Sequence, residues 1–453
     1  MSSASTLIST RAAEIAGARN VIVDPAALDA YAIGGMIPST AIRAESVEQI
    51  AEIMKFAVAE KLAIVVCAAR TKLDIGAPPR QYDLALDLTR LDRVVAYDPG
   101  DMTLSVEPGI PLHRIQSALT EHRQFLPLVV PFMDRATAAG TIASGIDSPL
   151  RQFYGTARDY VLGIEFVTGD GAAVKSGGRV VKNVSGYDIH KLMIGALGTL
   201  GVLTRINFRT FPLPAATRAI VATFGDAARA VALRHALAGS PLRPLVLEIV
   251  SPRAAELLGG KSLASNDDWS VVASFAGTPT ALERCERDVR KMAEQNGAAA
   301  FTSSDDEPSL AAPDRTSEFP AAALASSAAA TILKLSVLPT KMQAMLDAAA
   351  KAVDAAQMQW AATARGVGII YFALLPSERN EDALARVSRA TNEIFGRCAA
   401  LDGNATIPWC PAEWKSALPI WGPERSDLGP MRALKKVFDP HGVFSPGRFM
   451  GGI

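Results

Sequence analysis

The stretch GGRVVKNVSGYDIHKLMIGALGTLGVLTRINF, residues 177–208, contains six glycines and ends in an alternating apolar pattern. A Rossmann dinucleotide site requires G-x-G-x-x-G between a strand and a helix, with an acidic residue ~20 positions later. Here Gly195, Gly198 and Gly201 follow the spacing G-x-x-G-x-x-G, and the residues after Gly201 alternate at period two, which predicts a strand. The pattern therefore argues against NAD, and the lack of a Walker loop argues against ATP.

Glycines before and inside strands have another use. They let backbone N–H groups approach a large flat or phosphorylated ligand closely. The simpler alternative is that each glycine only forms a tight turn. Several glycine-containing segments that follow one another in a fixed order favour ligand binding over isolated tight turns, and this chain contains such a series.

The composition limits the classes of function. The 453 residues carry 46 basic and 46 acidic side chains, so the sequence shows neither a nucleic-acid footprint nor a polybasic membrane patch. No apolar run approaches the ~18–20 residues that span a bilayer, and the N-terminus lacks the pattern of a signal peptide. The length predicts two or three domains, and we expect a cytoplasmic protein.

The four cysteines and five histidines show no metal-binding spacing. Neither C-x-x-C, H-x-H nor H-E-x-x-H occurs, so we predict no disulfide framework, no iron–sulfur cluster and no other metal site. If the protein transfers electrons, an organic cofactor must carry them.

The first half of the chain mixes strands with short helices. A helix is predicted over 45–61, because Ser46 and Gln49 form a capping box and apolar residues then recur at helical spacing. The other predicted elements are a buried strand at 62–66, hairpins at 93–108 and 162–176, a short helix at 110–122 and a strand at 201–211. This is an α+β pattern.

The character of the chain changes after Pro214. Strands and helices alternate, and an alanine- and serine-rich stretch near 297–330 is predicted to be an exposed insertion or a partly disordered loop. The strand–helix pattern resumes at Thr331, and the last predicted helix ends at Asp439-Pro440 before an extended tail. The segment 409–421 contains three tryptophans, which suit either a core or an interface.

Five segments in order carry a resemblance to a known family. They are VVCAARTKLDIG, DPGDMTLSVEPGIPLHRIQSAL, QFLPLVVPFMDRATAAGTIASG, the stretch from YGTARDYV to GTLGVLT, and FDPHGVFSPGRF. The series resembles the flavoproteins of the vanillyl-alcohol oxidase / p-cresol methylhydroxylase (PCMH) superfamily, and most of all the FAD-binding subunits of bacterial glycolate oxidase. The similarity covers about 40–212 and 421–449, with GGRVVKNVSGYD as its most specific piece.

The resemblance implies an α+β fold with three parts. Residues 1–212 would form a two-subdomain PCMH-type FAD-binding domain, and residues 213–429 an α+β cap or substrate domain that includes the insertion near 297–330. Residues 430–453 would be a tail that returns to the FAD domain. FAD is expected to be noncovalent, because no histidine occupies the loop where many relatives attach the flavin.

The resemblance also implies the cofactor-binding residues. In such proteins the strand and loop at 66–72 wrap the FAD pyrophosphate with backbone amides. The usual G-G-G-T loop is here Ala68-Ala69-Arg70-Thr71, so Cβ atoms crowd the phosphate while Arg70 either adds charge or points to solvent. The full expected set is Ala68, Ala69, Arg70, Thr71, Lys72, Pro131, Thr137, Ala138, Ala139, Gly140, Ser144, Gly145, Gly155, Asp159, Val161, Gly198, Gly201 and Val202.

No catalytic residue is assigned from the sequence. Related single-chain enzymes place a histidine–metal cluster in the cap, whereas His235 is the only histidine between 213 and 430. Arg151, Arg158 and Arg365 are either carboxylate clamps or ordinary ion-pair partners. Lys182 and Asn183 either stabilise negative charge on the reduced flavin or shape their loop.

The function implied by the resemblance is that of an FAD-binding subunit in a glycolate (2-hydroxy acid) dehydrogenase complex. Its partners would be a second flavoprotein subunit and an iron–sulfur subunit that delivers electrons to a membrane quinone, so any membrane contact would be through the complex. Two alternatives remain open. One is a self-sufficient FAD-linked dehydrogenase or oxidase of another alcohol or hydroxy acid, and the other is a structural subunit that has lost FAD.

Overall fold

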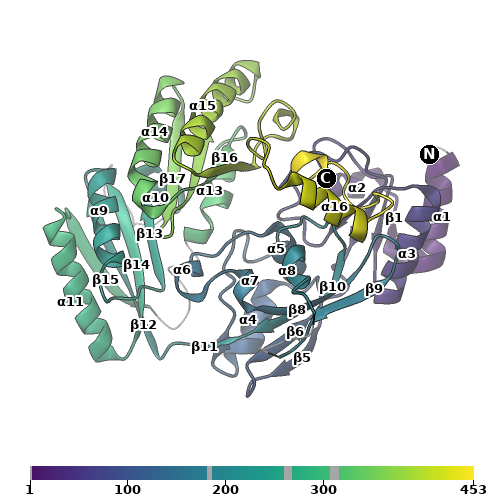
Figure 1. Ribbon diagram of the computed structural model, residues 1–453, viewed down its shortest axis with the longest axis horizontal. Coiled ribbons are helices and arrows are strands. Elements are labelled where there is room, and N and C mark those ends of the chain that lie inside the picture. Colours follow the sequence, from purple (N-terminus) through teal and green to yellow (C-terminus); the bar gives the residue numbers. More distant parts are fainter. Residues whose placement is uncertain (1–2, 181–185, 260–267, 307–315) are drawn as a thin grey trace.

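The computed structural model of the protein describes residues 3–180, 186–259, 268–306 and 316–453. In Figure 1 the N-terminal strands and short helices lie together with the C-terminus on one side, and a large sheet with long helices lies on the other. The candidates Lys182 and Asn183 lie outside the described residues.

A small sheet near the N-terminus has the strand order β1-β2-β4-β3, with β2, β4 and β3 parallel. Its strands are β1 (Val21–Ile22), β2 (Thr40–Arg43), β3 (Ile64–Cys67) and β4 (Leu84–Asp87). Helices α1 (Ser3–Ala16) and α3 (Val47–Glu60) share an apolar core with it, and the short α2 (Pro25–Leu28) precedes β2. The small sheet places the end of β3 beside the second sheet of this half.

The start of α3 confirms Ser46 as the predicted N-cap, while the reciprocal bond of Gln49 goes to the residue before Ser46. The Ser46 hydroxyl accepts a hydrogen bond from the Gln49 N–H at 3.2 Å, and the Gln49 side-chain carbonyl accepts one from the Glu45 N–H at 2.8 Å. The helix therefore begins where the sequence predicts, and β3 follows it directly.

The second sheet of this half is antiparallel, in the order β5-β6-β10-β8-β9. Its strands are β5 (Val94–Asp98), β6 (Thr103–Val106), β8 (Val161–Val167), β9 (Ala173–Gly177) and β10 (Val202–Arg209). The two predicted hairpins and the predicted strand after Gly201 are confirmed. The surrounding elements are α4 (Leu112–Thr120), α5 (Ala138–Ser144), α6 (Arg151–Tyr154), α7 (Ala157–Tyr160), α8 (His190–Met193) and the ribbon of β7 (Gln124–Phe125) with β11 (Phe211–Pro212).

Two glycines of the 177–208 stretch are needed for chain packing. Gly177 has a φ of +72°, and a Cβ there would lie 2.2 Å from the Leu162 carbonyl oxygen. A Cβ on Gly201 would lie 2.9 Å from the Phe166 ring and 3.0 Å from the Val167 carbonyl. The glycine pattern therefore partly reflects close strand packing.

The second half forms one antiparallel sheet of eight strands, in the order β15-β12-β14-β13-β17-β18-β16-β19. Its strands are β12 (Ala216–Phe224), β13 (Val246–Val250), β14 (Trp269–Gly277), β15 (Ala300–Asp306), β16 (Thr331–Ser336), β17 (Gln359–Arg365), β18 (Ile369–Leu375) and β19 (Asn404–Trp409). One face is covered by α9 (Ala227–Ala238), α11 (Pro279–Gln295), α14 (Met342–Ala355) and α15 (Glu381–Ala400).

The opposite face of this sheet packs toward the first half. In β18 the side chains alternate: Ile370 and Phe372 join the core under the long helices, whereas Tyr371 and Ala373 join a core shared with the second sheet. Because successive strand residues point to opposite faces, this alternation buries both faces.

The expectation of an exposed insertion or a partly disordered loop near 297–330 is wrong for residues 319–326, whereas residues 302–305 are exposed but belong to a strand. Residues 300–306 form β15, which pairs with β12 at the edge of the sheet, and residues 319–326 form helix α13 (Phe319–Ser326). Phe319 and Ala323 are fully buried, and α13 contacts α10 (Pro252–Leu257) and β18. Alanine is small enough for close helix packing, which composition alone does not distinguish from a loop. Residues 307–315 lie outside the described residues.

The C-terminal tail returns to the small sheet. Helix α16 (Leu428–Phe438) is followed by its C-cap Asp439. The Asp439 carboxylate accepts from the Val443 N–H at 3.0 Å and from the Phe444 N–H at 2.9 Å. The Ile64 N–H then donates to the Val443 carbonyl at 2.8 Å, so Phe444 adds a parallel bridge beside β3. The tail thus extends the sheet whose strand β3 leads into the candidate site.

Candidate cofactor site

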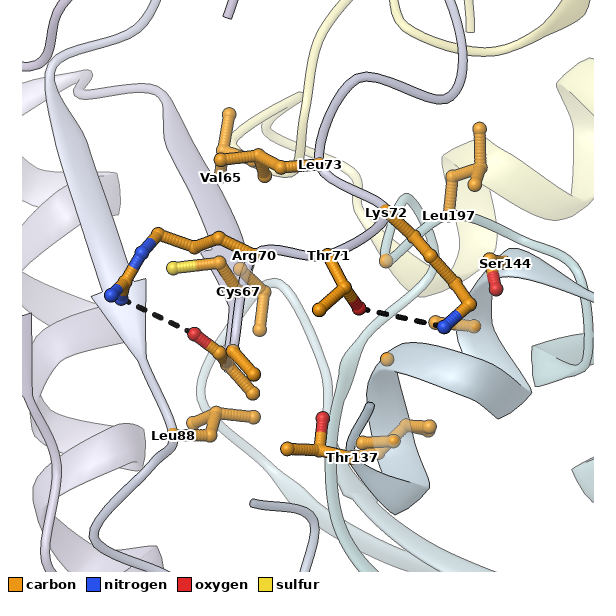
Figure 2. A pocket seen from close by; sticks show the side chains of 18 of the residues that line it. Val65, Cys67, Arg70, Thr71, Lys72, Leu73, Leu88, Thr137, Ser144 and Leu197 are labelled. Carbon is orange, nitrogen blue, oxygen red and sulfur yellow. Dashed lines mark hydrogen bonds between the residues drawn. The ribbon is translucent and has the colours of Figure 1, made fainter. Parts of the chain in front are cut away.

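A pocket lies where the loop after β3 meets helix α5 and the turn before β10 (Figure 2). The residues expected from the sequence that line it are Ala68, Ala69, Arg70, Thr71, Lys72, Thr137, Ala139, Gly140, Ser144, Gly198 and Gly201. Three segments far apart in sequence therefore form one concave surface, and small side chains dominate it.

Four expected residues lie beside the pocket rather than in its lining. The Pro131 carbonyl accepts from the Lys72 ammonium at 3.2 Å. Ala138 is buried in α5, and Val202 is buried at the start of β10. Gly145 ends α5 at a φ of +63°, and a Cβ there would lie 2.9 Å from the Gly195 Cα.

Gly155, Asp159 and Val161 are not in the pocket lining. The Asp159 carboxylate accepts from the Thr156 N–H at 2.7 Å and from its hydroxyl at 3.0 Å, which caps α7. Gly155 has a φ of +81° beside that carboxylate, and Val161 begins β8 opposite Phe208. These contacts give all three a structural role, and their contact with the cofactor stays a prediction.

Arg70 lines the pocket, but its charge is paired with a carboxylate of the chain. Its guanidinium donates to the buried Asp87 carboxylate at 3.0 Å and lies over the Tyr31 ring, 4.5 Å from its centroid. The Tyr31 hydroxyl donates to the same carboxylate at 2.6 Å, and burial followed by this contact raises the pKa of Tyr31. Figure 2 shows the Arg70 side chain extending away from Thr71 and Lys72.

The backbone at Arg70 keeps the conformation that glycine favours. Its φ of +62° lies in the left-handed region, which costs a residue with a Cβ about 1–2 kcal/mol. The ion pair with Asp87 and the ring contact with Tyr31 offset this cost. The backbone turn of a glycine-type loop is therefore retained although the glycine is absent.

The loop after β3 presents unused hydrogen-bond donors. In the part of the chain that the structure describes, the backbone N–H groups of residues 68–72 donate to no other protein group. Successive free N–H groups in a turn form a concave site for an anion. The loop sequence offered no sign of this, because the donors are backbone atoms.

Lys72 brings a buried ammonium to the pocket. Its side chain runs toward α5, where Ser144 lies, and its nitrogen contacts the Pro131 carbonyl at 3.2 Å and the Thr71 hydroxyl at 3.4 Å (Figure 2). No carboxylate of the described residues forms an ion pair with it. Burial lowers the pKa of Lys72 to about 8, and the more distant Glu318 offsets part of this effect.

Arg448 is the charged residue of the pocket lining that the expected set missed. It is 3% exposed, and one guanidinium nitrogen, Nη2, donates to the Leu73 and Ile75 carbonyls at 2.5 Å each. Its Nε and Nη1 atoms are buried and have no partner in the described chain. Burial lowers the pKa of Arg448 to about 10. The sequence signal that could have identified Arg448 was the tail segment FSPGRF, in which Arg448 lies 375 residues beyond Leu73.

These features fit the pyrophosphate of FAD. Free backbone N–H groups, a buried ammonium and an orphaned guanidinium surround a pocket with small walls, and anions are held by such donors. The side chains of Thr137 and Ser144 and the glycine at 140 leave room for a flat ring along α5. The pocket can therefore hold a phosphorylated aromatic cofactor.

A second cluster of charged residues lies between the eight-stranded sheet and the loop after α5. Glu248 and Arg365 are cross-strand neighbours on β13 and β17, and Lys334 and Tyr371 are neighbours on β16 and β18. We call these four residues the cap face. Arg365, Lys334 and Tyr371 contact Asp147, which lies three residues beyond Ser144, and Glu248 pairs with Arg365.

Asp147 supplies the counter-charge to the cations of the cap face. Its carboxylate lies 3.3 Å from Arg365 and 3.7 Å from Lys334, and Arg151 approaches it at 3.1 Å. The Tyr371 hydroxyl donates to it at 2.6 Å. Burial alone would raise the pKa of Asp147, but the three cations outweigh it and hold that pKa well below its usual range.

Two of the three candidate carboxylate clamps are thus ion-pair partners. Arg151 and Arg365 contact Asp147, and Arg365 also pairs with Glu248 at 2.8 Å. Arg158 donates to the Lys191 carbonyl at 2.8 Å.

No group of three His, Cys, Asp or Glu side chains among the described residues could hold a metal ion. Across the same residues, each helix is too short or too polar to cross a membrane.

Two family descriptions match the chain. The FAD binding domain matches residues 38–177, which include the loop 68–72 and α5. The C-terminal domain of FAD linked oxidases matches residues 213–406 and 421–449, which include the cap face and Arg448.

Several curated proteins are similar in sequence. Glycolate oxidase subunit GlcD of Bacillus subtilis is 24% identical over 432 residues, which cover 91% of this chain and 89% of that protein. Glycolate oxidase subunit GlcE of Escherichia coli is 37% identical over 162 residues, which cover 36% of this chain and 46% of that protein. A mitochondrial D-lactate dehydrogenase (cytochrome) of Arabidopsis thaliana is 25% identical over 91% of this chain and 74% of its own length.

Solved structures share the fold. Substrate-bound p-cresol methylhydroxylase superposes with a TM-score of 0.77 at 16% identity, covering 99% of this chain and 97% of its own. Alkyldihydroxyacetonephosphate synthase superposes with a TM-score of 0.73 at 15% identity, covering 95% and 84%. The predicted α+β fold of the PCMH type is confirmed.

Proposed function

Because the chain belongs to the FAD-linked oxidoreductases of the glycolate oxidase and D-lactate dehydrogenase family, we propose that it is the FAD-binding subunit of a glycolate (2-hydroxy acid) dehydrogenase complex. In this proposal it passes electrons from the hydroxy acid through its flavin to an iron–sulfur partner, beside a second flavoprotein subunit. Two relatives carry the name of glycolate oxidase subunits, which supports an assembly of several chains.

FAD, when bound, supplies the acceptor for a hydride, and the protein supplies its binding and orientation. The N–H groups of residues 68–72, with Lys72 and Arg448, would hold the pyrophosphate. Helix α5, beginning after Thr137, would lie along the ring. The pocket residues that the structure describes include no histidine, so we expect acid precipitation to release the flavin into the supernatant. Flavin retained by the pellet would mean a covalent link.

The observation that carries the proposal is the occupation of the cap face by Asp147. Oxidation of a 2-hydroxy acid needs a base for the hydroxyl proton and a cation for the carboxylate. Here Arg365, Lys334 and Arg151 already bind a carboxylate of the chain itself. Asp147 is a poor base because these cations hold its pKa low. A positioned base contributes ~10²–10⁴-fold to the rate, so we expect the isolated chain to oxidise the acid slowly.

Two of the three tryptophans of 409–421 lie in apolar cores, and Trp421 is partly buried. Trp409 and Trp414 are each 3% exposed and belong to apolar cores, so the core interpretation holds for both.

The test is steady-state turnover of glycolate and D-lactate by the purified chain with an artificial electron acceptor. The chain is assayed alone and after co-purification with its native partners. Activity that appears only with partners supports the proposal. Full activity of the single, FAD-loaded chain would instead make it a self-sufficient dehydrogenase, and colourless protein that takes up no FAD would make it a structural subunit.

A further inference from the structure

Four successive carbonyl groups beyond the pocket loop are held by two buried cations. The Arg448 guanidinium donates to the Leu73 and Ile75 carbonyls, and the Lys415 ammonium donates to the Gly76 carbonyl at 3.0 Å and to the Asp74 carbonyl. Lys415 follows β19, and Arg448 lies in the tail. Two segments distant in sequence therefore fix the loop that leads out of the pocket.

Both cations lack a carboxylate partner among the described residues. Arg448 is 3% exposed and Lys415 is 4% exposed, and neither forms an ion pair there. The exposed Asp74 carboxylate raises the pKa of each from a distance, but burial outweighs it and lowers both. A buried charge without a counter-ion is costly, so this arrangement favours the arrival of an anion.

The two cations differ in what they have left to donate. Lys415 is outside the pocket lining, and its ammonium is occupied by two carbonyls. Arg448 lines the pocket together with residues 65–73, and its Nε and Nη1 groups remain buried and unpartnered. A guanidinium is a planar fork of donors that matches phosphate oxygens in pairs.

We propose that Arg448 of the C-terminal tail is the residue that neutralises the pyrophosphate of FAD in this chain. One side of its guanidinium holds the loop carbonyls, and the other side binds the phosphate oxygens while the N–H groups of residues 68–72 complete the contact. Arg448 thereby supplies the charge that Arg70, bound to Asp87, does not supply. The proposal requires FAD binding only, and neither the substrate nor the partners proposed above.

A consequence is that FAD binding and docking of the tail stabilise each other. The Ala77 N–H donates to the Arg448 carbonyl at 2.9 Å, the Arg80 N–H to the Pro446 carbonyl at 2.8 Å, and the Ile64 N–H to the Val443 carbonyl at 2.8 Å. A ligand that tightens Arg448 must protect these amides, because coupling between two binding events is reciprocal.

The experiment compares three ligands in three proteins. FAD contains both flavin and pyrophosphate, ADP contains the pyrophosphate without the flavin, and riboflavin contains the flavin without phosphate. Their dissociation constants are measured by calorimetry and fluorescence for the wild type, Arg448→Met and Arg448→Lys. The matched control is Arg432→Met, since Arg432 is an exposed arginine of the same C-terminal region that donates to the Gly451 carbonyl at 3.3 Å.

We expect Arg448→Met to weaken FAD and ADP by at least about tenfold while riboflavin is unchanged, because a charge-assisted pair is lost. Arg448→Lys should be intermediate, and Arg432→Met should match the wild type. Hydrogen exchange at Ile64, Ala77 and Arg80 should slow on addition of FAD in the wild type and less so in Arg448→Lys.

Two results would overturn the proposal. One is wild-type affinity of Arg448→Met for FAD and ADP. The other is an equal loss for riboflavin, because Arg448 would then only shape the loop. If Arg448→Met does not fold, the same comparison is made with Arg448→Lys, for which equal loss of all three ligands counts against the proposal. Hydroxy acid turnover enters none of these measurements, so failure of the proposed function leaves them intact.

Discussion

The cofactor pocket and the cap face treat buried positive charge in opposite ways. In the pocket, Lys72 and Arg448 are buried without a carboxylate partner in the described chain. On the cap face, Arg365 and Lys334 meet Asp147, which the chain itself supplies. The first region is arranged to receive an anion, whereas the second already contains one.

The difference teaches which region of the protein depends on a ligand. A buried ion pair contributes little net stability compared with apolar packing, but removing one partner leaves a costly uncompensated charge. In the pocket the buried charges are uncompensated, and an anion that binds there removes this free-energy cost. The cap face has no such gain available while Asp147 stays in place.

The largest expected effect comes from breaking the cap face. Asp147→Ala removes the carboxylate from Arg365, Lys334 and Arg151, so we expect the free energy of unfolding to fall by about 3–5 kcal/mol. Chemical denaturation measures this loss. The matched control is Asp382→Ala, which removes an exposed partner of Arg386 and should change stability little. A near-wild-type value for Asp147→Ala contradicts the assignment.

A smaller effect is expected from one hydrogen bond of the same cluster. Tyr371→Phe removes the hydroxyl that donates to Asp147 at 2.6 Å and keeps the ring, so we expect a loss of about 1.5–3 kcal/mol. The FAD dissociation constant should stay unchanged, because the hydroxyl contacts the cap face and not the pocket lining. A matching loss of FAD affinity would mean that the two regions are coupled.

The pocket can be tested at the backbone by changing Ala69. Ala69→Gly keeps the N–H group and removes the Cβ, so this variant should bind FAD at least as well as the wild type. Ala69→Val adds β-branched bulk beside the phosphate position, and we expect it to weaken FAD binding by about 1–3 kcal/mol. Fluorescence titration distinguishes them, and equal affinity in both variants removes this loop from the site.

The local part of the fold could be predicted from sequence. The Ser46 cap, the two hairpins and the strand after Gly201 depend on residues a few positions apart, and patterns of period 2 and 3.6 reveal them. Most of the pocket lining followed from the family resemblance, since the loop after β3 and helix α5 lie in matched segments. Whether those residues contact FAD stays a prediction.

The pairing of the charged residues could not be predicted, because their partners are remote in sequence. Arg70, in the loop after β3, meets Asp87 at the end of β4, and Arg365 meets Asp147 after 218 residues. Sequence alone left Arg70 with two alternatives and gave no sign of its ion pair with Asp87. The prediction for the alanine-rich stretch was wrong for a different reason, because small side chains suit a packed helix such as α13 as well as a loop.

The smallest expected effect concerns pH and sharpens the contrast between the two regions. Burial lowers the pKa of Lys72 to about 8 in the folded chain, below the ~10.4 of an exposed lysine. Between these values the unfolded chain binds more protons, so the contribution of Lys72 to stability rises as pH increases through this window. FAD has the opposite preference, because its pyrophosphate favours the protonated ammonium.

We therefore expect FAD binding to take up a proton near pH 8, and its affinity to fall by up to about tenfold per pH unit above that value. Lys72→Met should bind FAD more weakly at pH 7 and lose this dependence. Lys351→Met, which changes an exposed lysine of α14, should retain the wild-type profile. Titrations from pH 6.5 to 9.5 measure the effect. An identical slope in the wild type and Lys72→Met would show that the ammonium lies away from the phosphate, and the free charge in the pocket would then be Arg448 alone.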